Sequence, residues 1–399
     1  MKALILAGGR SPNMAPFSAT RPNPLIPVDG ATLMDHTLGL LKQAGVNLAH
    51  IVVGHESAQM VNAIPSDHPS GVKVHFVEQT RGSGIGHAVA AAKDRFAPGE
   101  HFLLVYGDTF TADNIFSYAL QTYSLHNETT AAICHTAASE KYGNVYLDTD
   151  ARITRLIEKP KKEEGLYNYV LTGVFVVSST LFDHLDKNGL DMAAALRSLI
   201  KKETVRAAIW DGDWLDLAYP WDILTVNKIC MDQWREARIH ESVSIPQAEL
   251  RGPVRIEKNV EICSGVVLQG PLFIGEGSFI GHHAIIRPYS YIGPGSVIGR
   301  GAEVKNAVLF KNVRVGSQSF IGDSVVGEKA NFGPGCMTIN TDNAAGGVCV
   351  RIGRKKVASG FAKLGAFIGD GAVVGASNTI AAGTVVEAGR KIDHNISVR

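Results

Sequence analysis

Residues 274–299 read IGEGSFIGHHAIIRPYSYIGPGSVIG, and an aliphatic side chain recurs in this stretch at every sixth position. The same spacing continues unbroken through nine residues: Ile256, Ile262, Leu268, Ile274, Ile280, Ile286, Ile292, Ile298 and Val304. An α-helix repeats every 3.6 residues and a β-strand every 2, so neither produces this period. A six-residue period is typical of a β-helix in which each repeat forms one side of a triangular coil and the aliphatic residue points inward.

The period is interrupted further along the chain. After a slip it continues from Leu309 to Ile321, and it returns from Ile368 to Ile392. Residues 338–366 do not follow it, and we expect them to form a loop that projects from the coil. Glycine often follows the aliphatic residue, as in Ile274-Gly275 and Ile298-Gly299. We expect these glycines at turns whose backbone conformation costs other residues more.

Residues 1–228 have a different pattern, in which apolar strands alternate with helices. The expected strands are Ala3–Leu6, His50–Val53, Val72–Val77, Phe102–Tyr106, Thr130–Cys134 and Val170–Val177, with helices such as Leu33–Ala44 and Gly86–Arg95 between them. This alternation predicts an α/β domain with a mostly parallel sheet covered on both faces, and ligands in such sheets bind beyond the carboxyl ends of the strands. We therefore expect an α/β domain at 1–228, a linker at 229–249 that overlaps a connecting helix at Trp221–His240, and an all-β domain, the β-helix, at 250–399.

Composition excludes several classes of function. The formal net charge of the 399-residue chain is +1, which argues against binding nucleic acid through bulk charge. No apolar run approaches the ~18 residues of a membrane span, so we expect no membrane partner. The five cysteines include no Cys-x-x-Cys pair, which indicates neither a disulfide framework nor a zinc site. Cytoplasm is the expected location.

An ordered series of motifs in the first 228 residues resembles a known family. The series comprises Leu6-Ala7-Gly8-Gly9, Pro22-Asn23-Pro24-Leu25-Ile26-Pro27-Val28, Glu78-Gln79, Gly84-Ile85-Gly86-His87-Ala88, Tyr106-Gly107-Asp108, Tyr142-Gly143, Glu158-Lys159-Pro160, Thr172-Gly173 and Trp214-Leu215-Asp216. Together with the hexapeptide tail, the chain is similar to the bifunctional sugar-1-phosphate nucleotidylyltransferase/acetyltransferase family of the GlmU type. The resemblance implies a Rossmann-like nucleotidyltransferase domain followed by a left-handed hexapeptide β-helix, and a homotrimer.

The resemblance also implies a reaction and a set of residues. A nucleoside triphosphate would react with a hexose-1-phosphate to give a nucleoside diphosphate sugar and pyrophosphate. UTP and dTTP are the leading candidates for the nucleotide. Mg²⁺ favours carboxylate and phosphate oxygens, and Asp108 and Asp216 are its implied ligands. Lys159 is the implied cation for the sugar phosphate, Arg10 is our candidate for a further catalytic cation, and Gln79 offers a donor and an acceptor to a pyrimidine edge. The remaining implied substrate contacts are Ala7, Gly8, Gly9, Gly84, Gly143, Glu158, Thr172 and Gly173, and in the β-helix Arg287, Lys305, Asn331 and Asn340.

The sequence departs from the family pattern at positions that matter chemically. Asn13 and Asn23 stand where the family has Arg and Lys, and losing one positioned cation costs phosphoryl transfer on the order of 10³–10⁵ in rate. Arg10 or Arg21 could supply a substitute charge. In the β-helix, Ser317 stands where the family has its catalytic His, and a hydroxyl cannot act as the base near neutral pH.

Three functions therefore remain open from the sequence. The first is a nucleotidylyltransferase with an altered phosphate loop and weak turnover. The second is a non-catalytic or regulatory homologue that binds nucleotide or sugar nucleotide. The third is an acyltransferase acting through the β-helix.

Overall fold

The computed structural model describes residues 1–54, 57–136, 138–160, 169–245, 247–342 and 347–398. The chain divides into two compact units. Unit 1 comprises Met1–Arg10, Pro22–Leu25 and Thr32–Asp216; unit 2 comprises Ser11–Arg21, Ile26–Ala31 and Leu217–Arg399. None of the helices in these described ranges is long and apolar enough to cross a membrane. The expected domain limits stay a prediction, because a unit defined by contacts need not coincide with a region that folds by itself.

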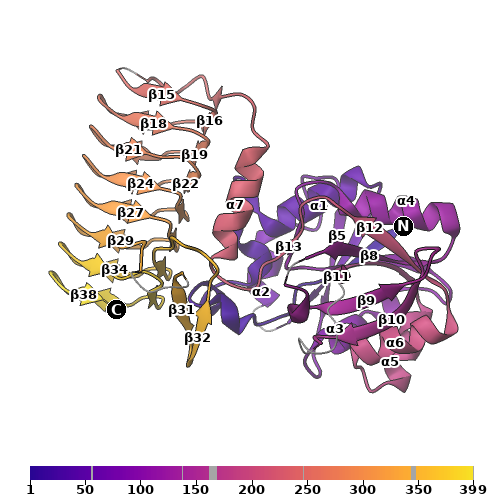
Figure 1. The fold of residues 1–399 in the computed structure, drawn as a ribbon. Coiled ribbons are helices and arrows are strands. Elements are labelled where there is room, and N and C mark those ends of the chain that lie inside the picture. Colours follow the sequence, from indigo (N-terminus) through magenta and orange to yellow (C-terminus); the bar gives the residue numbers. More distant parts are fainter. Residues whose placement is uncertain (55–56, 137, 161–168, 246, 343–346, 399) are drawn as a thin grey trace. The chain divides into compact units, whose positions relative to one another are not determined.

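Unit 1 is built around a nine-stranded sheet (Figure 1). Its strands are β1 (Lys2–Leu6), β4 (Leu48–Val53), β5 (Lys73–Glu78), β6 (His101–Tyr106), β8 (Thr129–His135), β9 (Gly143–Leu147), β10 (Ile153–Glu158), β11 (Tyr169–Ser178) and β12 (Val205–Trp210). The expectation of a mostly parallel sheet is wrong, because the sheet is mixed. β1 runs parallel to β4 and β6, whereas β11 runs antiparallel to β6, β8 and β9. β9 and β10 pair as a hairpin through residues 148–152, a short connection that only antiparallel strands allow.

Helices cover both faces of this sheet, as expected. They are α1 (Leu33–Gln43), α2 (Ser57–Ala63), α3 (Ile85–Ala91), α4 (Ile115–His126), α5 (Thr180–Lys187) and α6 (Met192–Lys202). One apolar core contains residues of α3, α5 and α6, and a second core contains residues of α1, α2 and α4. The start of α1 is fixed by a capping box, in which the Thr32 hydroxyl accepts from the Asp35 N–H and the Asp35 carboxylate accepts from the Thr32 N–H.

Unit 2 contains the coil that the six-residue period predicts. Three parallel sheets of eight, eight and seven strands run from β14 (Arg238–Ile239) to β36 (Val385–Val386), from β15 (Glu249–Arg251) to β38 (Ser397–Val398), and from β17 (Glu261–Ile262) to β37 (Lys391–Ile392). Ile256 pairs with Ile274 and Ile274 with Ile292, one coil of 18 residues apart, and all nine periodic aliphatic residues lie in the core. This architecture is consistent with a left-handed β-helix. The slip in the period is a coil one residue shorter, in which Ile292 pairs with Leu309.

The glycines after the aliphatic residues serve a purpose other than the one expected. Gly275 and Gly299 do not have positive φ, whereas Gly277 and Gly301, two positions later, do. A Cβ on Gly275 would lie 2.6 Å from the backbone nitrogen of Pro294, and one on Gly299 would lie 2.5 Å from that of Ser317. At these two positions the residue after the aliphatic side chain is glycine because the next coil passes too close for a side chain.

Unit 2 corrects the expected extent of the connecting helix and extends the expectation for residues 338–366. The connecting helix is α7 (Asp222–Asp232), which ends well before His240, because Arg238 and Ile239 already pair with the first full coil as β14. The expected interruption at 338–366 is present, since Val326 pairs directly with Ile368, but Thr338 itself still pairs with Ile380 in the coil. Residues 343–346 of this stretch lie outside the described residues. The interruption also contains an antiparallel hairpin of β31 (Cys349–Ile352) and β32 (Lys355–Ala358), which the period alone did not predict.

Candidate nucleotidyl-transfer site

The carboxyl ends of β1 and β4 bring two glycine turns into backbone contact. A Cβ on Gly8 would lie 3.1 Å from the Gly54 nitrogen, and a Cβ on Gly54 would lie 2.5 Å from the Gly8 carbonyl oxygen. The Gln79 side-chain oxygen lies 3.2 Å from the same Cβ position of Gly8, so the expected base-reading amide stands at this turn. Ala7 is buried and donates its N–H to the Val52 carbonyl, while Gly9 is exposed. Sequence reasoning missed Gly54, although it follows a strand as Gly8 does.

The two expected metal-binding carboxylates come from a pair of short strands. Asp108 immediately precedes β7 (Thr109–Phe110), which pairs antiparallel with β13 (Leu215–Asp216) so that Thr109 is opposite Asp216. Both aspartates line one cavity of about 250 Å³. Burial raises the pKa of the Asp108 carboxyl above its ordinary value, against a lowering by its own backbone hydrogen bond.

This donor set suits a hard divalent cation. Mg²⁺ is usually held by one or two carboxylates, and phosphate oxygens and water complete its octahedron. Within the described ranges no group of three His, Cys, Asp or Glu residues is placed to hold a metal. Asp108 and Asp216 would hold such an ion only together with ligands from a bound phosphate and water. A buried carboxylate whose charged form is disfavoured gains from a nearby cation. The pair therefore fits Mg²⁺ delivered with a triphosphate.

Two glycines leave room for neighbouring side chains in the lining of the cavity. A Cβ on Gly143 would lie 3.0 Å from the Glu158 carboxylate oxygen Oε2. Gly173 has a φ of 83°, and a Cβ there would lie 2.9 Å from the Tyr106 ring. Gly143 thus leaves room for the Glu158 carboxylate, and Gly173 leaves room for Tyr106. The lining offers one carboxylate acceptor and an aromatic side chain, a combination that suits a polyhydroxyl ligand.

Two lysines line the same cavity. Lys159 has the left-handed φ of 44°, and its N–H donates to the Tyr142 carbonyl over 3.1 Å. Strained backbone of this kind is common at binding sites. The Nζ atom of Lys159 lies 4.0 Å from the Glu158 Oε1. Lys141 ends the short helix η5 (Ser139–Lys141) and was missed by sequence reasoning, although it directly precedes the Tyr142-Gly143 motif. The lining of the cavity therefore includes two cations, Lys141 and Lys159.

Thr172 and Gly84 both accept hydrogen bonds through their backbone carbonyl groups. The Thr172 hydroxyl donates to the Ala132 carbonyl over 2.9 Å, so it is committed to the sheet. The Thr172 carbonyl accepts from Trp214 Nε1 over 2.9 Å, which fixes Trp214 at the cavity wall. Gly84 has a φ of 96° and caps the start of α3, where its carbonyl accepts from the Ala88 N–H.

The expected phosphate loop places little charge near this cavity. Arg10 is exposed, does not line the cavity, and forms no ion pair with any described residue. Asn13 is exposed in the short helix η1 (Pro12–Met14), whereas Asn23 is 3% exposed. Arg21, the other candidate for a substitute charge, is engaged in unit 2 by the carboxylates of Asp370 and Glu328. It is therefore a structural cation.

The polar residues expected in the β-helix are also largely engaged with their neighbours. Arg287 donates to Glu303 over 2.8 Å, and Lys305 donates to the buried carboxylate of Asp323 over 2.9 Å. The Asn340 amide donates to the same Asp323 carboxylate over 2.6 Å. Asn331 lies in β29 (Asn331–Phe332), on a different sheet from these residues. Ser317 is half-buried at a turn between coils.

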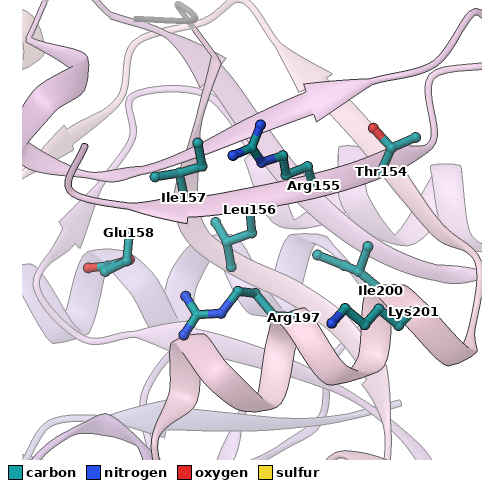
Figure 2. A pocket seen from close by; sticks show the side chains of 8 residues that line it. All are labelled: Thr154, Arg155, Leu156, Ile157, Glu158, Arg197, Ile200 and Lys201. Atoms are coloured by element: carbon teal, nitrogen blue, oxygen red, sulfur yellow. The ribbon is translucent and has the colours of Figure 1, made fainter. Parts of the chain in front are cut away.

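A second, larger hollow of about 790 Å³ lies between β10 and α6 of unit 1. Figure 2 shows Arg197 and Lys201 extending from α6 beside the apolar side chains of Leu156 and Ile200. Leu156 and Glu158 line both this hollow and the cavity of the two aspartates. Arg197 and Lys201 are exposed surface cations, so the hollow is an open groove beside the candidate site.

Comparisons with known proteins agree with the motifs. A family model described as Nucleotidyl transferase matches residues 2–233, and the GMPPB C-terminal domain model matches residues 268–357. A "Bifunctional protein GlmU" of Methanococcus maripaludis is 33% identical over 94% of this chain and 89% of its own length. The "Bifunctional sugar-1-phosphate nucleotidylyltransferase/acetyltransferase" of Sulfurisphaera tokodaii is 29% identical over 98% of this chain and 96% of its own.

Solved structures share the fold of the first part of the chain. A putative glucose-1-phosphate thymidylyltransferase from Bacillus anthracis superposes with a TM-score of 0.53 at 20% identity, covering 60% of this chain and 98% of that one. A UDP-glucose pyrophosphorylase complexed with UDP-glucose gives 0.53 at 19% identity, covering 57% and 97%. The expected resemblance is confirmed: this chain belongs to the nucleotidyl transferase family, as a sugar-1-phosphate nucleotidylyltransferase homologue with a hexapeptide-repeat tail.

Proposed function

We propose that the cavity of unit 1 transfers a nucleotidyl group from UTP or dTTP to a hexose-1-phosphate. A phosphate oxygen of the sugar-1-phosphate attacks the α-phosphorus of the triphosphate. The bond from that phosphorus to the bridging oxygen breaks, and pyrophosphate leaves. Catalysis of such a step is mostly positioning and charge stabilisation. The observation that carries the proposal is the meeting of Asp108 and Asp216 in one cavity with two lysines.

Each part of the site has a task in this proposal. Gly8 and Gln79 receive the edge of the base, with Gln79 offering both a donor and an acceptor. Glu158 accepts hydroxyl protons from the hexose, and Lys159 and Lys141 draw the charge of its phosphate. Asp108 and Asp216 would hold Mg²⁺, and the bound ion would neutralise charge on the triphosphate. Transfer then needs only that the two anions be held together away from bulk water.

Turnover should be weak, because the leaving pyrophosphate has little cationic support. Asn13 and Asn23 carry no charge, and Arg21 already forms ion pairs within unit 2. Arg10 is the remaining arginine of the loop, and it is exposed. The same facts favour the second candidate function, a homologue that binds nucleotide without turning it over.

The deciding experiment is a screen for pyrophosphate release with the full chain and Mg²⁺. Four nucleoside triphosphates are each combined with several hexose-1-phosphates. We expect slow release that needs both substrates and is fastest with UTP or dTTP. Absence of release with every pair, alongside measurable nucleotide binding by calorimetry, would leave the binding function as the correct one.

The assembly and the β-helix are separate parts of the proposal. We expect a homotrimer built through the coil, so light scattering should give about three times the chain mass of 42.7 kDa; a mass near that of one chain would refute it.

Acetyl transfer is not expected, because Ser317 replaces the base and Lys305 is held by Asp323. Acetylation of glucosamine-1-phosphate by acetyl-CoA would contradict this.

A further inference from the structure

The open groove between β10 and α6 has room for a small molecule. Its volume of about 790 Å³ falls in the usual range of ligand pockets, roughly 300–1,000 Å³. Both elements lie within unit 1, so the groove belongs to one compact unit. The apolar part of its lining is Leu156, Ile157 and Ile200 (Figure 2). Its described lining residues include no aromatic side chain, so the groove offers a nucleobase no ring to stack on.

Two cations of α6 line the groove without a protein partner. Arg197 and Lys201 are exposed, and neither forms an ion pair or a side-chain hydrogen bond with the residues that the structure describes. They are four residues apart, so they lie on one face of the helix, about 6 Å apart along its axis. Figure 2 shows both side chains on the side of α6 that faces β10. Like charges at this spacing weaken a helix.

The end of the helix explains only one of these two cations. Lys201 and Lys202 lie in the last turn of α6, where positive charge interacts favourably with the helix dipole. Arg197 lies one turn earlier, and the effect of the dipole falls off within the last turn. An anion bound between Arg197 and Lys201 would relieve their repulsion. The third cation of the lining, Arg155, already lies over the Tyr146 ring, 5.2 Å from its centroid.

We propose that Arg197 and Lys201 bind the diphosphate group of a small molecule in this groove. A guanidinium group binds phosphate oxygens through two parallel hydrogen bonds, and an ammonium group binds them as a point charge. Two cations one helical turn apart can therefore hold one phosphate each. Free pyrophosphate and nucleoside diphosphate sugars both contain this group, and the lining recognises the part that they share.

The groove shares parts of its lining with the cavity of the two aspartates. Leu156 and Glu158 line both hollows, and α6 also contributes Met192 and Leu196 to the cavity. A diphosphate in the groove and a sugar phosphate in the cavity would thus be two anions in adjacent hollows. Because like charges repel, each ligand should weaken the binding of the other by the same factor. This coupling, unlike the diphosphate site itself, rests on the proposed function.

Calorimetry of the full chain with inorganic pyrophosphate tests the site. Mg²⁺ is removed with a chelator, so that the two aspartates of the cavity have no cation to attract the ligand. In the double variant Arg197→Gln/Lys201→Gln we expect the Kd to rise at least about tenfold. Glutamine keeps a high helix propensity, so α6 should form normally. An equal Kd in parent and double variant, or no binding by the parent, would overturn the proposal.

Two further variants control for the position of the ligand. Lys202 is exposed on the same helix but does not line the groove, so Lys202→Gln removes one positive charge and should leave the Kd unchanged. Lys141→Met, in the cavity, should also leave it unchanged. Loss of binding in Lys141→Met would place the pyrophosphate in the cavity and overturn the groove site.

Two more measurements identify the ligand and the coupling. A tenfold loss in the double variant with UDP-glucose as well would identify a nucleoside diphosphate sugar, and a loss confined to pyrophosphate would identify the free ion. Saturating pyrophosphate should raise the parent's Kd for glucose-1-phosphate about fivefold and leave that of the double variant unchanged. An unchanged Kd in the parent would overturn the coupling. A parent that binds no glucose-1-phosphate would count against the proposed function, while the pyrophosphate titration would still decide the groove site.

Discussion

The cavity of unit 1 and the polar cluster of the coil contain the same kinds of side chain, yet they differ in what those side chains do. In the coil, Lys305 and Asn340 donate to Asp323, whose side chain is 6% exposed. In the cavity, Asp108 and Asp216 share a hollow of about 250 Å³ with lysines on its rim. Charges that satisfy one another stabilise a fold, whereas charges gathered around a hollow can act on a ligand. The identity of a residue in a motif does not distinguish these two situations, but its partners do.

The largest expected effect is on the cavity carboxylates. Asp108→Asn and Asp216→Asn should each lower the rate of pyrophosphate release at least about 100-fold, because Mg²⁺ would lose half of its protein ligands. Titration with Mg²⁺ should show the loss of metal dependence in both variants. Equal metal dependence in parent and variants would mean that these aspartates are turn caps, and the difference between the two regions would disappear.

The second prediction compares the same substitution at one lysine of each region. Lys305→Met leaves the buried Asp323 carboxylate without its cation and should lower the free energy of unfolding by about 3 kcal/mol. Lys141→Met should leave that free energy unchanged and instead lower turnover. Denaturant unfolding and pyrophosphate release are measured on both variants. A stable Lys305→Met protein, or an unstable Lys141→Met protein, would show that the assignment of structural and functional lysines is reversed.

The third prediction restores charge to the loop. Asn13→Arg should raise turnover at least about tenfold, which is about 1.4 kcal/mol of transition-state stabilisation, because position 13 is exposed and can accept a long cation. Adding Asn23→Lys should lower the melting temperature, because that site is buried and the ammonium group would lose water. No gain in the single variant, together with a silent parent, would favour the binding homologue.

The smallest expected effect concerns pH and stability. Burial raises the pKa of Asp108, so the folded protein holds this proton more tightly than the unfolded chain does. Stability without metal should therefore fall as pH rises through the ordinary range of an aspartate toward the raised pKa. At neutral pH, Asp108→Asn should melt slightly higher than the parent protein without Mg²⁺. An Asn variant that melts lower would indicate that the carboxylate is structural, like Asp323.

The coil could be predicted in detail because each six-residue repeat contains one aliphatic side chain that points into the core. The meeting of Asp108 and Asp216 could be predicted only through the family resemblance, since it depends on β7 and β13, two-residue strands with no pattern of their own. The mixed sheet was missed because β11 is a continuous apolar strand, and an apolar run does not reveal strand direction. The engagement of Arg21 was out of reach because its partner Asp370 lies 349 residues further along the chain.

That separation has a consequence for the order in which the protein is completed. Translation at roughly 5–20 residues per second takes roughly 17–70 s to go from residue 21 to residue 370. During this time the sheet of unit 1 can form, but the loop after Gly9 has no coil to dock on. The nascent chain therefore contains both aspartates of the cavity well before Arg21 can pair with Asp370. Formation of the Arg21–Asp370 ion pair therefore reports that the last part of the coil has been synthesised and folded.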